Sequence, residues 1–207
     1  MRKDLFMSLR HQPKAALIND FSGFGRCSVT VALPIISQMK VQCCPVLTSV
    51  FSNHTGYPSF YFDDYTEKMP SYIAEWKKLN LHFECIAAGF LGSERQIEIV
   101  KNFIRDFKDE TTKVLIDPVM GDHGRTYQTF TPEMCSQMKQ LAHFADILTP
   151  NLTEACILTD TPYHDGHWQM SELSELALSL IAMGPSKVVI TGVSMGTFIG
   201  NVICESG

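Results

Sequence analysis

Carboxylates, hydroxyls and glycines recur in this sequence directly after short apolar runs. The clearest case is Asp117, which follows the run Val114–Ile116 and precedes a proline. A carboxylate at the end of a buried strand needs a cation or hydrogen-bond donors, and Mg²⁺ is a natural partner. Glu154 falls in the first turn of a helix expected after Pro150, where it could merely complement the helix dipole. Asp117 and Glu154 together could instead hold a metal ion through water, as nucleotide–Mg²⁺ sites do.

Two glycines, Gly23 and Gly25, lie in a turn cluster after the apolar run Lys14–Ile18. A strand followed by a glycine-rich loop is the first half of a βα unit. The pair does not complete the dinucleotide-binding fingerprint, because Ser28 occupies the third glycine position. Taken alone, the two glycines favour a tight turn over a ligand site.

Two other candidates lie in loops. His54 stands among hydrogen-bonding groups in residues 51–58, and its neighbours leave a substrate role and a surface role equally open. Phe90 lies in the segment Gly89–Gly92, and it is either a core ring or a ring that stacks on an aromatic ligand.

The elements that must position these residues alternate between strand and helix. The helix after Ser93 is the most clearly defined, because Ser93 and Gln96 match a capping box and an apolar stripe follows from Ile97. The pattern repeats five or six times, which predicts an α/β fold with a mostly parallel sheet. The expected strands are residues 14–18, 41–50, 83–88, 114–116, 146–149 and 187–191, with a hairpin strand at 197–204. Helices are expected over residues 27–39 and 64–79 and after Ser93, Thr131, Pro150 and Ser171.

Ligands of parallel α/β sheets bind beyond the carboxyl ends of the strands. Small and polar residues follow each expected strand at that position, so they should converge on one edge of the sheet. This convergence is the strongest functional signal in the residues themselves. The residues that follow the strands include Asn19, Asp20, Ser22, Asn53, His54, Thr55, Gly89, Asp117, Asn151, Glu154 and Thr191.

Composition narrows the class of protein. The chain has 207 residues, 45% hydrophobic and 19% charged, which is typical of one large globular domain and excludes a disordered chain or a coiled-coil rod. The net charge of −5, without a basic block, argues against a nucleic-acid partner and favours a small molecule. No apolar run is long enough to span a membrane. The seven cysteines form no Cys-x-x-Cys pair and are expected to be reduced, mostly buried thiols of a cytoplasmic protein.

Five segments, in order along nearly the whole chain, resemble the pyridoxal (vitamin B6) kinases of the ribokinase-like superfamily. The most specific are Ser52–Tyr57 (SNHTGY) and Asp117–Asp122 (DPVMGD). The other three are Asn19–Gly25, Gly89–Ser93 and Thr149–Glu154. The resemblance implies a three-layer α/β/α sandwich that transfers the γ-phosphoryl group of ATP to the 5′-hydroxymethyl group of pyridoxal, pyridoxine or pyridoxamine. It also implies a homodimer.

Site roles follow from the resemblance, position by position. It implies a metal site for Mg²⁺ at Asp117 and Glu154, and contacts from Asn151 and Thr191 to the nucleotide phosphates. These roles fit the chemistry, because phosphoryl transfer depends mainly on positioning and charge neutralisation. The residues expected around the pyridine ring are Asp20, Ser22, His54, Thr55 and Phe90.

The sequence departs from that family at its late Gly-x-Gly-Asp motif, whose aspartate is the catalytic base. Gly121-Asp122 lacks the preceding glycine, and Gly23–Gly25 is followed by Arg26. We therefore expect residues 1–207 to be one incomplete kinase domain, truncated at its C-terminus, with little or no activity. We also expect one face of its sheet to be partly uncovered, with exposed apolar surface and a tendency to associate. Hydroxymethylpyrimidine kinase is the nearest alternative enzyme, and a non-catalytic B6-binding module is the alternative outside catalysis.

Overall fold

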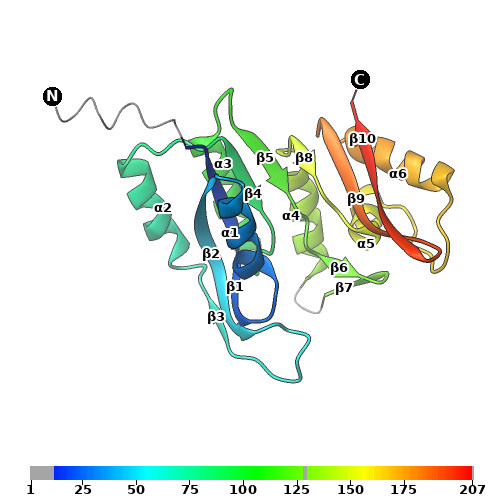
Figure 1. The fold of residues 1–207 in the computed structure, drawn as a ribbon, viewed down its shortest axis with the longest axis horizontal. Coiled ribbons are helices and arrows are strands. Elements are labelled where there is room, and N and C mark those ends of the chain that lie inside the picture. The colour runs from blue at the N-terminus through cyan, green and yellow to red at the C-terminus, as the bar shows by residue number, and fades with distance from the viewer. Residues whose placement is uncertain (1–11, 128–129, 207) are drawn as a thin grey trace.

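The computed structural model describes residues 12–127 and 130–206, and these fold around one large sheet (Figure 1). Its strand order is β10-β9-β8-β5-β4-β1-β2-β3. The six strands from β9 to β2 are parallel, and the edge strands β3 and β10 are antiparallel to their neighbours. This confirms the mostly parallel α/β sheet and the C-terminal hairpin. The strands are β1 (Lys14–Phe24), β2 (Gln42–Asn53), β3 (Phe62–Asp64), β4 (Cys85–Ala88), β5 (Lys113–Ile116), β8 (Ile147–Leu148), β9 (Lys187–Met195) and β10 (Phe198–Glu205).

The helices alternate with the strands, as expected. A small separate hairpin, β6 (Gly121–Asp122) with β7 (Arg125–Thr126), follows β5. The helices of the described residues are α1 (Ser28–Gln38), α2 (Met69–Lys78), α3 (Glu94–Phe107), α4 (Pro132–Ala142), α5 (Leu152–Thr159) and α6 (Met170–Ile181).

The helix starts follow local chemistry, with two differences from the sequence expectation. The Ser93 hydroxyl accepts the Gln96 N–H at the start of α3, but the Gln96 side chain bonds elsewhere, so the reciprocal half of the capping box does not form. Helix α6 begins two residues earlier than a Ser171 cap would place it, because its N-cap is Gln169. The Gln169 N–H donates to the carboxylate of Glu172 at 2.7 Å, and this bond fixes the earlier start.

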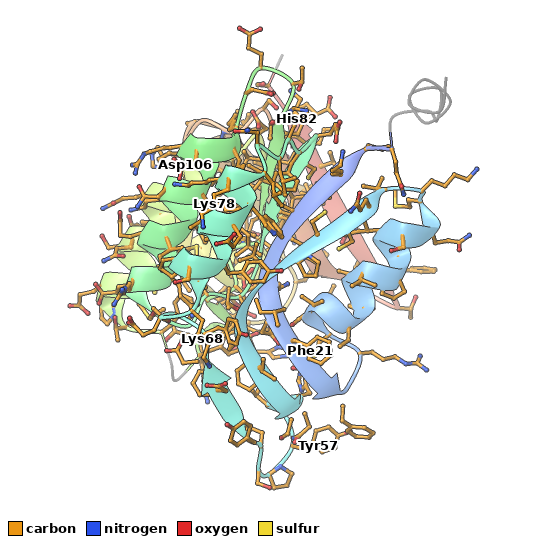
Figure 2. All side chains as sticks on the ribbon, turned by 90° about the vertical axis from the view of Figure 1, so that its left-hand side faces the viewer. Phe21, Tyr57, Lys68, Lys78, His82 and Asp106 are labelled. Atoms are coloured by element: carbon orange, nitrogen blue, oxygen red, sulfur yellow. The ribbon has the colours of Figure 1, made fainter. Side chains whose placement is uncertain are left out.

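The two faces of the sheet differ in how well they are covered. Helices α2 to α6 supply buried side chains to one core, whereas α1 lies on the opposite face (Figure 2). On β5, Val114 and Ile116 point into that core and are fully buried, and Leu115 between them is half-buried. Residues 114–116 are therefore not buried on both faces of the sheet, as a continuous apolar run predicts. Leu115 is the exception, because no helix of the described residues covers it.

Apolar side chains continue across this less covered face, which we call the open face. Leu17, Ala87, Leu115 and Ile147 are register partners on neighbouring strands, and α1 covers only the β1–β2 end of this row. Within α1 itself only Val29 is buried, and Ile35 is 56% exposed. The expectation of exposed apolar surface on one face is confirmed.

Strand β1 is longer than the sequence indicated. The residues expected to form a glycine turn continue as strand to Phe24 and pair with β2, which runs to Asn53. The register shifts between Asn19 and Phe21, and a bulge of this kind re-aims the side chains around it. Asp20 and Ser22 are both buried, because they continue the alternation of Ala16 and Ile18 on the core side of the strand.

Two further expectations concern cysteines and membranes. All seven cysteines are free, as expected, but only Cys156 is buried and the other six are half-buried. Cys43 and Cys44 lie in β2, and Cys44 packs against the core. No helix within the described ranges is long and apolar enough to cross a bilayer.

Candidate functional site at the carboxyl edge of the sheet

The carboxyl ends of the parallel strands bring most of the candidate residues to one edge of the sheet. The end of β1 carries Asp20 and Ser22, and Phe90 follows β4. Asp117 follows β5, and its N–H donates to the carbonyl of Ala88 at 2.8 Å. Figure 1 shows the ends of β1 and β2 and the β6–β7 hairpin on the same side of the molecule.

Asp117 and Glu154 form the acidic centre of this edge. Glu154 is buried, and Asp117 is half-buried with no hydrogen bond to its carboxylate among the described residues. Burial raises the pKa of Asp117 to about 6. Burial, with a smaller contribution from the charge of Asp117, raises the pKa of Glu154 to about 8, against the opposing effect of backbone N–H donors. No cationic side chain of the described residues lowers either pKa.

Glu154 also has a structural role, because it closes the capping box of α5. Its carboxylate accepts the N–H of Asn151 at 2.8 Å and the N–H of Met120 at 3.2 Å. Glu154 can thus both stabilise the start of α5 and contribute negative charge beside Asp117.

The expected phosphate contacts are Asn151, which lies between β8 and α5, and Thr191 of β9, and the two form an isolated parallel β-bridge. The Asn151 side chain caps α5 by accepting the Glu154 N–H at 3.0 Å, and its amide donates to the Gly121 carbonyl at 2.9 Å. The Thr191 N–H donates to the Pro150 carbonyl at 2.8 Å. Asn151 therefore holds the β6–β7 hairpin against the start of α5, beside the acidic centre.

A second buried carboxylate, Asp20, lies at the other end of this edge. It accepts hydrogen bonds from the Ser22 hydroxyl at 3.1 Å and from the Ser28 hydroxyl at 2.5 Å. Ser28 is the residue whose presence broke the glycine fingerprint. Its hydroxyl links the start of α1 to the end of β1.

Phe90 is half-buried and leaves part of its ring exposed at the edge. Its ring lies edge-on to Phe51 with the ring centres 5.9 Å apart, and Phe51 in turn contacts Phe60 and Phe62. An aromatic wall of this kind suits a flat ring ligand.

His54 and Thr55 are not part of the buried group. Both are exposed in the loop after β2, which Figure 2 shows projecting from the sheet near Tyr57. The His54 ring Nδ1 accepts the Gly56 N–H at 3.0 Å, and the His54 N–H donates to the Phe24 carbonyl at 2.9 Å. The loop is thus attached to the end of β1, and its side chains face solvent.

Sequence reasoning missed Ser28 and Tyr127, and it placed Asn19 at this edge without assigning it a role. Ser28 donates to Asp20, and Asn19 accepts the N–H of Phe90 at 3.0 Å. Tyr127 lies near the acidic centre. Its pKa is raised first by burial and then by the negative charges of nearby carboxylates, of which Glu154 contributes most. Asn19 and Ser28 could have been proposed from the sequence, because each is a polar residue close to the end of a strand. Nothing in the sequence around Tyr127 indicates a role at this edge.

The donor set fits a divalent cation that is shared with a phosphorylated ligand. Two carboxyl groups, one of them without a hydrogen-bond donor, stand in a partly desolvated position, and burial raises the pKa of both. The described residues do not contain a cluster of three or more metal-ligating side chains. A magnesium ion here would therefore take most of its ligands from phosphates and water, as Mg²⁺ usually does.

Comparison with known proteins shows the family. Residues 33–206 match the family model for phosphomethylpyrimidine kinase. Pyridoxal kinase of Arabidopsis thaliana is 31% identical over 161 residues, which is 73% of this chain and 49% of that protein. Pyridoxal kinase of Sus scrofa is 32% identical over 153 residues, 68% of this chain and 45% of that protein. The chain thus spans about half the length of these curated relatives.

Solved structures agree in fold. A Bacteroides thetaiotaomicron protein named as a phosphomethylpyrimidine kinase superposes with a TM-score of 0.87 at 47% identity, covering 91% of this chain and 65% of that one. Pyridoxal kinase from Lactobacillus plantarum superposes with a TM-score of 0.83 at 29% identity, covering 92% and 68%. The sheet described above is therefore that of the ribokinase-like α/β fold. The chain belongs to the phosphomethylpyrimidine kinase family, among the pyridoxal kinase-like proteins of the ribokinase superfamily.

Proposed function

We propose that this chain is the substrate- and metal-binding part of an ATP-dependent kinase that phosphorylates the 5′-hydroxymethyl group of pyridoxal, pyridoxine or pyridoxamine. One observation carries the proposal. A second crystal form of the Bacteroides thetaiotaomicron protein, 48% identical and superposing with a TM-score of 0.85, holds pyridoxal. The pyridoxal kinases among the relatives support the same reaction.

Each end of the edge has a separate task in this reaction. Asp20, with Ser22 beside it, offers a buried hydrogen-bonding group to the polar substituents of the pyridine ring. Phe90 offers its exposed ring surface for stacking. His54 and Thr55 lie in the exposed loop after β2, from which they would reach the ring only as that loop folds over it.

The end of the edge that carries Asp117 and Glu154 would bind the charged groups of the reaction. Asp117 and Glu154 would hold Mg²⁺, which neutralises the phosphate oxygens of ATP when bound. Nucleotide use is supported by a Leishmania donovani pyridoxal kinase structure that contains ADP, although at 20% identity that likeness concerns the fold. Asn151 and Thr191 stand where the nucleotide phosphates would meet α5, whose N-terminal N–H groups favour an anion.

Three further features of the proposal rest on the resemblance. We propose a cytoplasmic homodimer and a single kinase domain over residues 1–207 that is incomplete without a Gly-x-Gly-Asp segment. Because that segment supplies the base and the anion hole of the family, residues 1–207 by themselves are expected to bind the vitamer and to turn over ATP poorly.

A coupled assay of ATP consumption tests the reaction, using the chain extended through a Gly-x-Gly-Asp segment and residues 1–207 alone as its matched control. Pyridoxal should stimulate ATP turnover by the extended chain far more than by residues 1–207. Absence of pyridoxal-dependent turnover in the extended chain would refute the kinase proposal. If pyridoxal binds to it saturably in calorimetry nonetheless, a non-catalytic B6-binding module is the better description.

Hydroxymethylpyrimidine kinase is a second candidate, favoured by the family model and by a thiamine biosynthetic bifunctional enzyme of Arabidopsis thaliana that is 25% identical over 189 residues. Both substrates are flat heteroaromatic alcohols. We expect kcat/KM for pyridoxal to exceed that for hydroxymethylpyrimidine by at least about tenfold, the smallest ratio that clearly separates two such pockets. A reversed ratio in the same assay would assign the pyrimidine alcohol as the substrate.

A further inference from the structure

The loop Gly89–Gly92, which carries Phe90 from β4 towards α3, is held by a side-chain amide at each end. At its start, Asn19 Oδ1 accepts the N–H of Phe90 at 3.0 Å and also the N–H of Asp20 at 3.0 Å. At its end, Gln96 Oε1 accepts the N–H of Gly92 at 2.7 Å. Side chains thus supply hydrogen bonds that no strand neighbour offers at these points.

The Gln96 end of the loop is fixed to the rest of the fold. Gln96 is fully buried, and its amide nitrogen donates to the Thr48 carbonyl at 2.8 Å and the Thr66 hydroxyl at 2.8 Å. It also donates to a carboxylate oxygen of Asp64 at 3.1 Å. This network ties α3 and the end of the loop to β2 and β3. At the other end the Gly89 N–H donates to the Ile18 carbonyl of β1 at 2.9 Å, so the position of Phe90 relative to β1 is set by this bond and by Asn19.

Asn19 and Gly89 also fit together sterically. A Cβ atom on Gly89 would lie 2.6 Å from Asn19 Nδ2 and 2.9 Å from its Cγ, and the three nearest atoms all belong to Asn19. The backbone of Gly89 is not among the positive-φ glycines, so the shortage of space, rather than the conformation, requires glycine there. A side chain at position 89 would therefore displace the Asn19 side chain from the place that it holds.

We propose that Asn19 is a positioning residue for the ring site: through one oxygen atom it sets Phe90, on the loop after β4, relative to Asp20, on the end of β1. The inference rests on the proposed function, since it names what aligns two residues of the proposed vitamer site. Asn19 acts through those two residues, and its own oxygen is already occupied by two N–H donors.

Calorimetric titration of the 207-residue chain with pyridoxal tests the inference, with thermal unfolding recorded for each variant. We expect Asn19→Ala to raise the pyridoxal dissociation constant about tenfold, because two backbone N–H groups lose their acceptor. Asn19→Asp retains the acceptor oxygen and should bind within about threefold of the unsubstituted chain. Asn102→Ala, an exposed asparagine on α3, is the matched control and should leave the affinity unchanged.

Gly89→Ala tests the same contact from the other side and leaves every hydrogen-bonding group in place. As a single substitution, Gly89→Ala should weaken pyridoxal binding. In a chain that already carries Asn19→Ala it should have little further effect, because the Asn19 atoms that would crowd the new Cβ are gone. Additive losses, or an Asn19→Ala chain that melts earlier but binds pyridoxal as well as the unsubstituted chain, would overturn the positioning role and leave the proposed function intact. No saturable binding by the unsubstituted chain would overturn both.

Discussion

Asp117→Asn is expected to stabilise the metal-free chain above pH 7 while it removes function. The carboxyl group of Asp117 has its pKa raised from 3.8 to about 6 by burial, so the native state binds its proton more tightly than the unfolded state does. The free energy of unfolding therefore falls as the pH rises from about 4 to about 6, and the loss is complete above that range. Asparagine carries no charge at any of these values and avoids the loss.

The expected gain at pH 8 is on the order of 3 kcal/mol, since each pKa unit corresponds to about 1.4 kcal/mol. For a chain of this size that is a rise in the unfolding midpoint of roughly 5–10 °C. At pH 4 the two proteins should unfold at nearly the same temperature. Differential scanning calorimetry with a chelator present measures both, and Asp165→Asn, at an exposed carboxylate, is the matched control.

Function should move in the opposite direction. If Asp117 holds Mg²⁺ as proposed, the same substitution should lower pyridoxal-dependent ATP turnover in an active, extended chain by roughly 10²–10³-fold, the cost of losing an electrostatic partner at the transferred group. Stability gained where activity is lost is the usual signature of a functional buried charge. An Asn variant that melts at or below the unsubstituted chain at pH 8 would contradict the assignment of Asp117 as an uncompensated carboxylate.

Two neighbouring residues of β5 should differ sharply in what their truncation costs. Ile116→Ala removes a fully buried side chain from the main core and is expected to cost about 3–4 kcal/mol of unfolding free energy. Leu115→Ala removes as many carbon atoms from the open face, where the side chain is only half-buried, and should cost about 1–2 kcal/mol. In a sheet covered on both faces the two costs would be similar.

Urea denaturation at two protein concentrations, tenfold apart, measures the difference. The Ile116→Ala cost should be the same at both. If chains associate through the open face, the Leu115→Ala cost will increase at the higher concentration, since association stabilises only the folded state. Equal costs for both variants at low concentration would show that the open face is covered in solution.

The order of the elements could be predicted from the sequence because hydrophobic periodicity and capping are local signals. The stripe from Ile97 to Phe107 and the cap at Ser93 are confirmed in α3. The end of β1 could not be predicted in the same way. Its glycines and polar residues indicate a turn, and only pairing with β2, a long-range contact, extends the strand to Phe24.

The residues of the candidate site likewise differ in whether local sequence signals or long-range contacts determine their position. Asp117, Asn151 and Glu154 come together because each follows a strand of the parallel sheet. Thr191 lies within β9, which continues past the expected end, and joins them through its bridge to Asn151. The burial of Asp20 continues the alternation of Ala16 and Ile18 into a segment that the sequence indicates as a turn, and the Ser28 hydroxyl that bonds Asp20 leaves no pattern in the sequence. His54 and Thr55 were placed at the correct edge, but whether their loop lies against the sheet is decided by tertiary packing.

The length of β1 has a mechanical consequence. Strand β4 pairs with β1 only as far as Ile18, whereas β1 and β2 continue together to Phe24 and Asn53. Beyond Ile18 this pair extends past β4 for roughly 20 Å at about 3.3 Å per residue, supported on its outer side by the short pairing of β2 with β3. A small change of angle at its root is magnified at its tip, where His54 is tied to Phe24. Asn19 lies at the start of this extension. The residue that we propose to align the ring site therefore also lies where a change of angle would move the loop of His54 the most.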